Sequence, residues 1–146
     1  MISSFIFQIL NTKVIFSAQR TTWGNVQGDL HFNQVDINIG GGFGGKIFTA
    51  PISGIYKMTF SGISGFNQFE LYMADFTSII VKKNNQDMFY IFDGNENGKG
   101  EDQNNISYTW MLELIKGDEV KLWSDNYVFV STISSLTFTG ELIHID

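Results

Sequence analysis

The sequence has no cysteine, a single proline and few basic residues among its 146. Without cysteine, the chain cannot form disulfides, use a thiol as a nucleophile or bind zinc through thiolates. Nine Lys and Arg against fifteen Asp and Glu give a net charge of −6, and the basic residues are scattered along the chain. Because nucleic acids and anionic membranes attract clustered positive charge, we expect neither as a partner.

Long hydrophobic runs and helical periodicity are missing as well. The apolar stretch at residues 1–10 is far shorter than the roughly 20 residues of a membrane-spanning helix, and we expect no membrane insertion. It also lacks the basic start and the small-residue cleavage site of a complete signal peptide. We expect residues 1–13 to contain an ordered N-terminal strand, with the remains of a longer precursor as the alternative.

Aromatic residues, by contrast, are abundant: fourteen Phe, five Tyr and three Trp make up 15% of the chain. With 43% hydrophobic residues, the chain has the size and composition of one domain with a full core. A single domain of this size must bury nearly all of its aromatic side chains or leave some at an interface. Composition therefore allows for self-association.

Short segments of alternating apolar and polar residues, separated by turn residues, indicate an all-β chain. In the clearest segment, Tyr56, Met58 and Phe60 share one face. The predicted strands are at about residues 4–10, 14–20, 29–38, 45–51, 54–64, 68–73, 77–84, 87–93, 106–116, 118–125, 127–132 and 135–145. Many short strands at nearly regular spacing are typical of a β-sandwich or barrel.

A spaced set of aromatic, Asn and Gly residues runs through the middle of the chain. It consists of Phe32, Asn38, Phe43, Phe48, Gly54, Tyr56 and Phe60, followed by Leu112-x-Leu114-x-x-Gly117-Asp118-x-Val120 and Phe138-x-Gly140-x-Leu142. Over about residues 14–145 this pattern resembles the globular head domain of C1q-type proteins, which belongs to the tumour necrosis factor-like jelly-roll superfamily. The chain departs from the pattern in a shortened spacing between Phe43 and Phe48 and in Met58, which replaces a Phe.

The resemblance implies a ten-stranded jelly-roll β-sandwich over residues 14–146, assembled as a compact homotrimer. It also implies a set of residues that serve the core or the trimer: Phe16, Phe32, Phe48, Gly54, Tyr56, Phe60, Gly117, Phe138 and Gly140. The implied function is that of a secreted, non-enzymatic recognition module, of the kind used in innate immunity, that binds extracellular protein, carbohydrate or lipid ligands through its loops. Two alternatives are a structural trimerising head of a larger assembly and a tumour necrosis factor-like cytokine.

One acidic segment has the spacing of a calcium site. Asp93, Asn95, Asn97 and Glu101 would supply oxygen ligands, with Gly98 permitting the sharp bend. Position twelve of the calcium-loop pattern is Asn104 rather than the usual bidentate Glu, and the flanks have the pattern of strands. These flanks favour a solvated acidic loop over a calcium site, and calcium is the one cofactor that the sequence suggests.

Other motifs give no sign of catalysis. A hydrolase needs a nucleophile beside a base, but the only histidines are His31 and His144, both in predicted strands, and no signature motif surrounds any Ser. The glycine-rich residues 40–45 match the residue spacing of a phosphate-binding motif. Such a site requires a helix after the glycines, whereas a strand pattern follows here, so we expect a surface turn. Asn105 is an N-glycosylation acceptor if the protein is secreted by a eukaryote.

Overall fold

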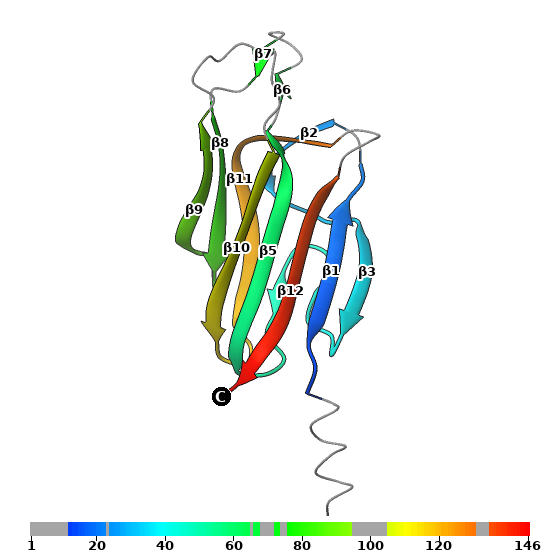
Figure 1. Ribbon diagram of the computed structural model, residues 1–146, viewed down its shortest axis with the longest axis vertical. Coiled ribbons are helices and arrows are strands. Elements are labelled where there is room, and N and C mark those ends of the chain that lie inside the picture. Colours follow the sequence, from blue (N-terminus) through cyan, green and yellow to red (C-terminus); the bar gives the residue numbers. More distant parts are fainter. Residues whose placement is uncertain are drawn as a thin grey trace, which may run out of the picture.

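A computed structural model of the chain shows two β-sheets packed face to face (Figure 1). The structure describes residues 12–22, 24–64, 66–67, 72–73, 76–94, 105–130 and 135–146. The ten strands of the sandwich are β1 (Ile15–Arg20), β2 (Gly24–Asp29), β3 (Gln34–Ile39), β4 (Phe48–Thr49), β5 (Gly54–Ser64), β8 (Phe76–Lys83), β9 (Gln86–Gly94), β10 (Asn105–Leu114), β11 (Glu119–Val130) and β12 (Leu136–Ile145). Two further short strands, β6 (Phe66–Asn67) and β7 (Tyr72–Met73), pair only with each other.

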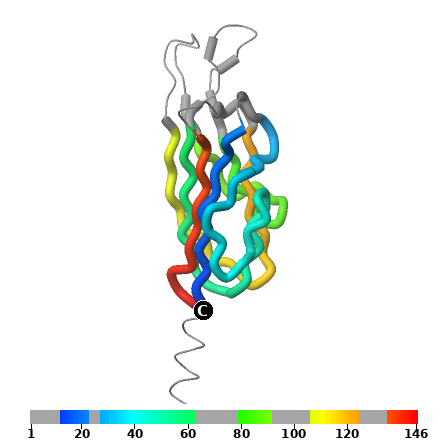
Figure 2. Tube along the Cα trace, turned by 90° about the vertical axis from the view of Figure 1, so that its right-hand side faces the viewer, coloured from blue at the N-terminus to red at the C-terminus, as the bar shows by residue number. Residues whose placement is uncertain are grey.

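The ten strands form two layers of five. The front sheet has the order β3-β1-β12-β5-β10 and faces the viewer in Figure 1. In the back sheet, β9 and β8 lead to β11, which pairs with both β2 and β4 at different points along its length. The side view in Figure 2 shows the two layers, which β11 joins at one end by a short pairing with β5. The predicted ten-stranded jelly roll is confirmed.

Several of the predicted strands have different boundaries in the structure: the strand predicted at 45–51 is only β4 (Phe48–Thr49), and β2 was not predicted. The predicted strand 29–38 is wrong, because β2 ends at Asp29 and the chain crosses to the other sheet before β3 begins. In the crossing segment, the Asn33 side-chain oxygen accepts a hydrogen bond from the Thr21 backbone N–H at 2.9 Å, and its amide donates to the Thr21 hydroxyl at 2.8 Å. Side-chain hydrogen bonds of this kind compete with strand pairing.

The predicted strands 118–125 and 127–132 are instead the single strand β11. The Asp125-Asn126 pair, which predicted a turn, falls within a register shift between Ser124 and Val128 in the pairing of β11 with β2. A bulge of this kind absorbs the extra residues without ending the strand. The predicted strand at residues 4–10 lies outside the described residues.

Aromatic rings fill the space between the sheets. The ring of Phe16 stacks on Phe43 at a centroid distance of 4.7 Å and on Phe48 at 4.9 Å, and it meets the edge of Phe138 at 4.9 Å. The buried aromatic side chains of this core are Phe16, Phe32, Phe43, Phe48, Tyr56, Phe60, Trp110 and Phe138. The aromatic residues of the sequence pattern are therefore core residues, which leaves the molecular surface to other side chains.

Three positions of the pattern have steric or hydrogen-bonding roles. Gly140 lies opposite Phe16 in the pairing of β12 with β1, and a Cβ on Gly140 would overlap the Phe16 ring. A Cβ on Gly54 would collide with the carbonyl oxygen of His144. The Tyr56 hydroxyl donates a hydrogen bond of 2.6 Å to the Ile52 carbonyl, and burial raises the pKa of this phenol.

Turn residues close the lower end of the sandwich in Figure 1. Gly117 adopts a positive φ of 97° in an exposed turn, so this position serves the turn and not the core. Asp118 accepts hydrogen bonds from the Asn84 side chain at 3.0 Å and from the Ile115 N–H at 2.9 Å, and Lys83 lies 3.5 Å from its carboxylate. The Asn84 contact first, then the Ile115 and Lys83 contacts, lower the pKa of Asp118. One carboxylate thus ties together two turns that are distant in sequence.

The glycine-rich segment is an ordered turn that leads into a strand. Asn38 closes it, since its amide donates to the Phe43 carbonyl at 3.0 Å and its oxygen accepts from the Phe43 N–H at 3.4 Å. Gly42 has a φ of 105°, which a residue with a side chain rarely adopts. The strand β4 follows, as predicted, in place of the helix that a phosphate site requires.

Candidate interaction face

The outer surface of the front sheet, here called the front face, is rich in hydroxyl groups. Strand alternation and register place these residues on it: Ile15, Ser17, Gln19, Ile37, Ile39, Ile55, Lys57, Thr59, Ser61, Ser107, Thr109, Met111, Glu113, Thr137, Thr139 and Glu141. The Thr59 and Thr109 hydroxyls lie 2.9 Å apart across β5 and β10, and Thr137 donates to Ser61 at 3.1 Å across β12 and β5. Because these groups bond to one another, they can lose water at a lower cost than unpaired hydroxyls.

Exposed aliphatic side chains flank the hydroxyl-rich centre on both sides. Ile37 and Ile39 on β3 are 44% and 50% exposed, and Met111 on β10 is 65% exposed. Single exposed apolar residues are common on soluble proteins. Here, however, they lie on the two outer strands of a sheet whose central strands carry hydroxyls bonded to one another, so the front face combines apolar margins with a polar centre.

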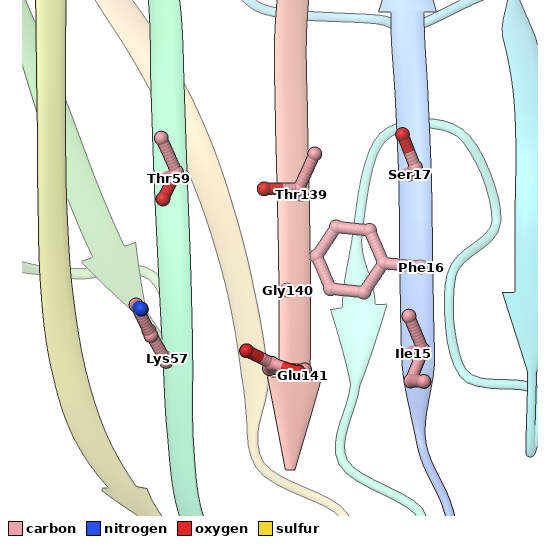
Figure 3. A pocket seen from close by; sticks show the side chains of 8 residues that line it. All are labelled: Ile15, Phe16, Ser17, Lys57, Thr59, Thr139, Gly140 and Glu141. Atoms are coloured by element: carbon pink, nitrogen blue, oxygen red, sulfur yellow. The ribbon is translucent and has the colours of Figure 1, made fainter. Parts of the chain in front are cut away.

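The middle of the front face is hollowed. The hollow has a volume of about 340 Å³ and lies over β1, β12 and β5. It is lined by Ile15, Phe16, Ser17, Lys57, Thr59, Thr139, Gly140 and Glu141 (Figure 3). Gly140 is turned toward the core, where a Cβ would overlap the Phe16 ring, so only its backbone lines the hollow.

The front face has few charged residues, and its Lys57 and Glu141 form no ion pair within the described residues. Lys57 and Glu141 are directly opposed in the pairing of β5 with β12, yet neither forms an ion pair within the described part of the chain. Asp36, at the β3 edge, accepts hydrogen bonds from Gln34 at 2.8 Å and Gln19 at 2.9 Å, and these bonds lower its pKa.

The outer surface of the back sheet, here called the back face, pairs its charges within the chain. Asp29 lies 2.9 Å from the Lys46 ammonium and 3.3 Å from that of Lys121. Burial by itself would raise the pKa of Asp29, but the two lysines outweigh burial and lower it. Lys82 lies 3.3 Å from Asp87 and 5.0 Å from the centroid of the Trp123 ring. The back face thus pairs its charges within the chain, and it also exposes the aromatic side chain of Tyr90, at 59%.

Most of the predicted calcium site lies outside the described residues. Asp93 lies near the end of β9, where only its backbone is described, and Asn95, Asn97 and Glu101 lie outside the described residues. In the parts of the chain that the structure describes, no three His, Asp or Glu side chains gather into a group that could hold a metal ion. Calcium binding stays a prediction.

The remaining predicted residues lie apart from one another. Asn105 is the first residue of β10, and its glycosylation stays a prediction. His144 lies on β12 as predicted, whereas His31 lies in the crossing between β2 and β3 and not in a strand; both side chains are exposed. The front face itself was missed by the sequence analysis, although the alternate Thr and Ser of residues 59–61 and 137–139 were a readable signal. Across the described ranges, no helix has the length and apolarity that a membrane crossing requires.

Comparison with known proteins agrees with this architecture. A sequence model of the C1q domain family matches residues 15–143, whereas no curated protein matches significantly. The globular domain of zebrafish complement 1qA has a TM-score of 0.66 and 20% identity, covering 91% of this chain and 99% of its own. Eiger TNF from S. frugiperda has a TM-score of 0.66 and 10% identity, covering 92% and 95%. Murine APRIL has a TM-score of 0.60 and 11% identity, covering 90% and 100%. At these identities the structural likeness shows a shared fold.

Proposed function

This chain belongs to the C1q domain family, and on that premise we propose that it is a non-enzymatic, extracellular recognition module that works as a homotrimer. In this proposal the front face provides the contact between copies. The loops at the ends of the sandwich remain free to bind a protein, carbohydrate or lipid ligand. The observation that carries the proposal is the contrast between the two sheet surfaces, one with paired charges and one with apolar margins and unpaired charges.

Burial of the front face would remove exposed aliphatic side chains from water while the central hydroxyls keep their hydrogen bonds. The hydroxyls of Thr59 and Thr109 already satisfy each other, and Ile37, Ile39 and Met111 would leave water. Covering the back face would instead remove water from ion pairs, which carries a desolvation penalty. A contact of about 800 Å² per partner is typical of stable protein pairs. A three-fold ring closes such contacts without leaving an open end.

Trimerisation would also strengthen ligand binding. Three identical loop clusters on one particle can engage a multivalent surface at once, and avidity of this kind exceeds single-site affinity by about 10²- to 10⁴-fold. A weak site on each copy would then suffice for recognition of a protein or glycan surface. The fold by itself suits a tumour necrosis factor-like cytokine too, but the family match is to the C1q domain.

The proposal can be tested with a single charge placed on the front face. Thr59→Arg puts a cation at the hydroxyl-rich centre, and Thr49→Arg, at the exposed residue of β4 in the other sheet, is the matched control. We expect wild type and Thr49→Arg to be trimers and Thr59→Arg to be a folded monomer. On protein and glycan arrays, the trimers should bind a ligand, and the monomer should bind the same ligand at least about tenfold more weakly. A trimer that binds no array ligand would instead support the structural-head alternative.

A further inference from the structure

We propose that Lys57 of one copy forms an ion pair with Glu141 of a neighbouring copy, and that this pair fixes how the copies meet. The inference rests on the proposed function, since it concerns the face through which we propose that the chain assembles. It adds a specific contact, which the fold and the family match do not define.

The first observation is that neither of these two charges has an ion-pair partner within the described chain. Lys57 on β5 and Glu141 on β12 are both exposed, and Ile55, Thr59 and Thr139 lie beside them along their own strands. Glu113 on β10 and His144 on β12 both pair with Ile55. On the back face, by comparison, lysines and aspartates form ion pairs with one another.

The second observation is where the two side chains lie. Both line the hollow in the front face, and Figure 3 shows them at the same end of it, on neighbouring strands. Their backbones are in register, so an ion pair within one chain is sterically accessible, yet the side chains do not form one. A group from another copy that enters this hollow would therefore meet one free cation and one free anion side by side.

Charge complementarity then identifies the occupant as a second copy. If the front face is buried, an unpaired Lys57 or Glu141 would be strongly unfavourable in the interface. The hollow of each copy carries one charge of each sign, so in a closed ring Lys57 can face one neighbour and Glu141 the other. Every charge is then paired, and a shifted arrangement would bring like charges together, which disfavours it.

The test is a charge-reversal mixing experiment. Lys57→Glu leaves two anions in the hollow and Glu141→Lys leaves two cations, so each variant alone should associate at least about tenfold more weakly than wild type. In a mixed ring of three, two contacts join unlike variants and pair opposite charges while one joins like variants, so the equal mixture should assemble more readily than either variant alone but less readily than wild type. Native mass spectrometry distinguishes mixed from uniform assemblies. Lys116→Glu and Glu119→Lys make the same charge changes at exposed positions off the front face and should assemble normally, alone and mixed.

Each remaining outcome bears on the inference. If both reversed variants form trimers as wild type does, the ion pair is wrong while the trimer stands. If the double variant Lys57→Glu/Glu141→Lys assembles but mixing the single variants gives no gain over either one alone, the pair lies within one chain and the inference is overturned. A wild type that stays monomeric would instead overturn the proposed function. Formation of mixed assemblies also shows that both variants fold, and Lys57→Met with Glu141→Gln should show milder losses in the same assay.

Discussion

At the scale of the residue, the sequence pattern identifies the core well. Its aromatic residues were predicted to serve the core or the trimer, and the structure places Phe16, Phe48 and Phe138 in one ring cluster. These positions can be predicted from sequence because bulky apolar side chains at regular spacing in a β-sandwich are buried between the two sheets. The role of Asn84 is not readable in this way, since its partner Asp118 is distant in sequence and only the fold brings them together.

The aromatic cluster predicts a large loss of stability on truncation. Phe138 is fully buried and contacts Phe16 and Trp110, so Phe138→Ala should lower the free energy of unfolding by about 3–5 kcal/mol. Ile115→Ala, which truncates a side chain that is 69% exposed, is the control and should change it by less than about 0.5 kcal/mol. Chemical denaturation measures both. A loss below about 1 kcal/mol for Phe138→Ala would show that the cluster does not exist as described.

The hydrogen-bonded Asp118 predicts a specific pH dependence. Its pKa in the folded state lies below the ordinary value of 3.8, so ionised Asp118 stabilises the fold above that value. This contribution is lost as the pH falls through the folded pKa. Asp118→Asn should therefore flatten the acid limb of the stability curve, and Glu119→Gln in the same turn should leave the Asp118 contribution in place. Thermal melts over the acid range measure this; equal acid limbs in wild type and Asp118→Asn would contradict it.

At the scale of the element, the sequence predicts which strands exist better than where they end. Alternation locates β5, β8 and β12 closely, because one buried face imposes a period of two. It fails at residues 29–38, where the pattern continues across a crossing between sheets. It also fails at β11, where residues typical of a turn lie in a bulge and the strand continues through them. Both errors concern pairing between strands distant in sequence, which a local pattern does not contain.

The turn after β3 predicts a modest effect of removing its closing side chain. Asn38 makes two hydrogen bonds to the Phe43 backbone, so Asn38→Ala should cost about 1–2 kcal/mol of stability. Gln86→Ala removes an exposed amide that makes no such contact and is the control. Chemical denaturation of the two variants gives the comparison, and equal, negligible losses would mean that the Asn38 bonds do not hold the turn.

The acidic segment after β9 carries the calcium prediction. If Asp93, Asn95, Asn97 and Glu101 bind calcium, the lack of a terminal Glu should place the affinity near the weak end, about 10⁻⁴ to 10⁻³ M. Millimolar calcium should then raise the melting temperature of wild type, and Asp93→Ala should abolish the rise. Equal stabilisation of both proteins would move the site elsewhere, and no stabilisation of either would leave a solvated acidic segment.

At the scale of the whole molecule, the outer surfaces of the two sheets differ in their charges and in their apolar residues. The back face keeps its charges in ion pairs, while the front face combines bonded hydroxyls, aliphatic margins and two unpaired opposite charges. Composition allowed for exposed aromatic residues at an interface. Among the described side chains the exposed aromatics are only Tyr90 and Tyr108, and aliphatic residues flank the front face instead. The difference arises because the jelly-roll core is large enough to take the rings.

Sedimentation of the wild-type chain across micromolar concentrations tests the central claim most directly. We predict one major species at three times the chain mass of 16.5 kDa, which dissociates on dilution or on Thr59→Arg substitution and persists in Thr49→Arg. A single species at 16.5 kDa with no dependence on concentration would contradict the claim that the front face joins copies of this chain.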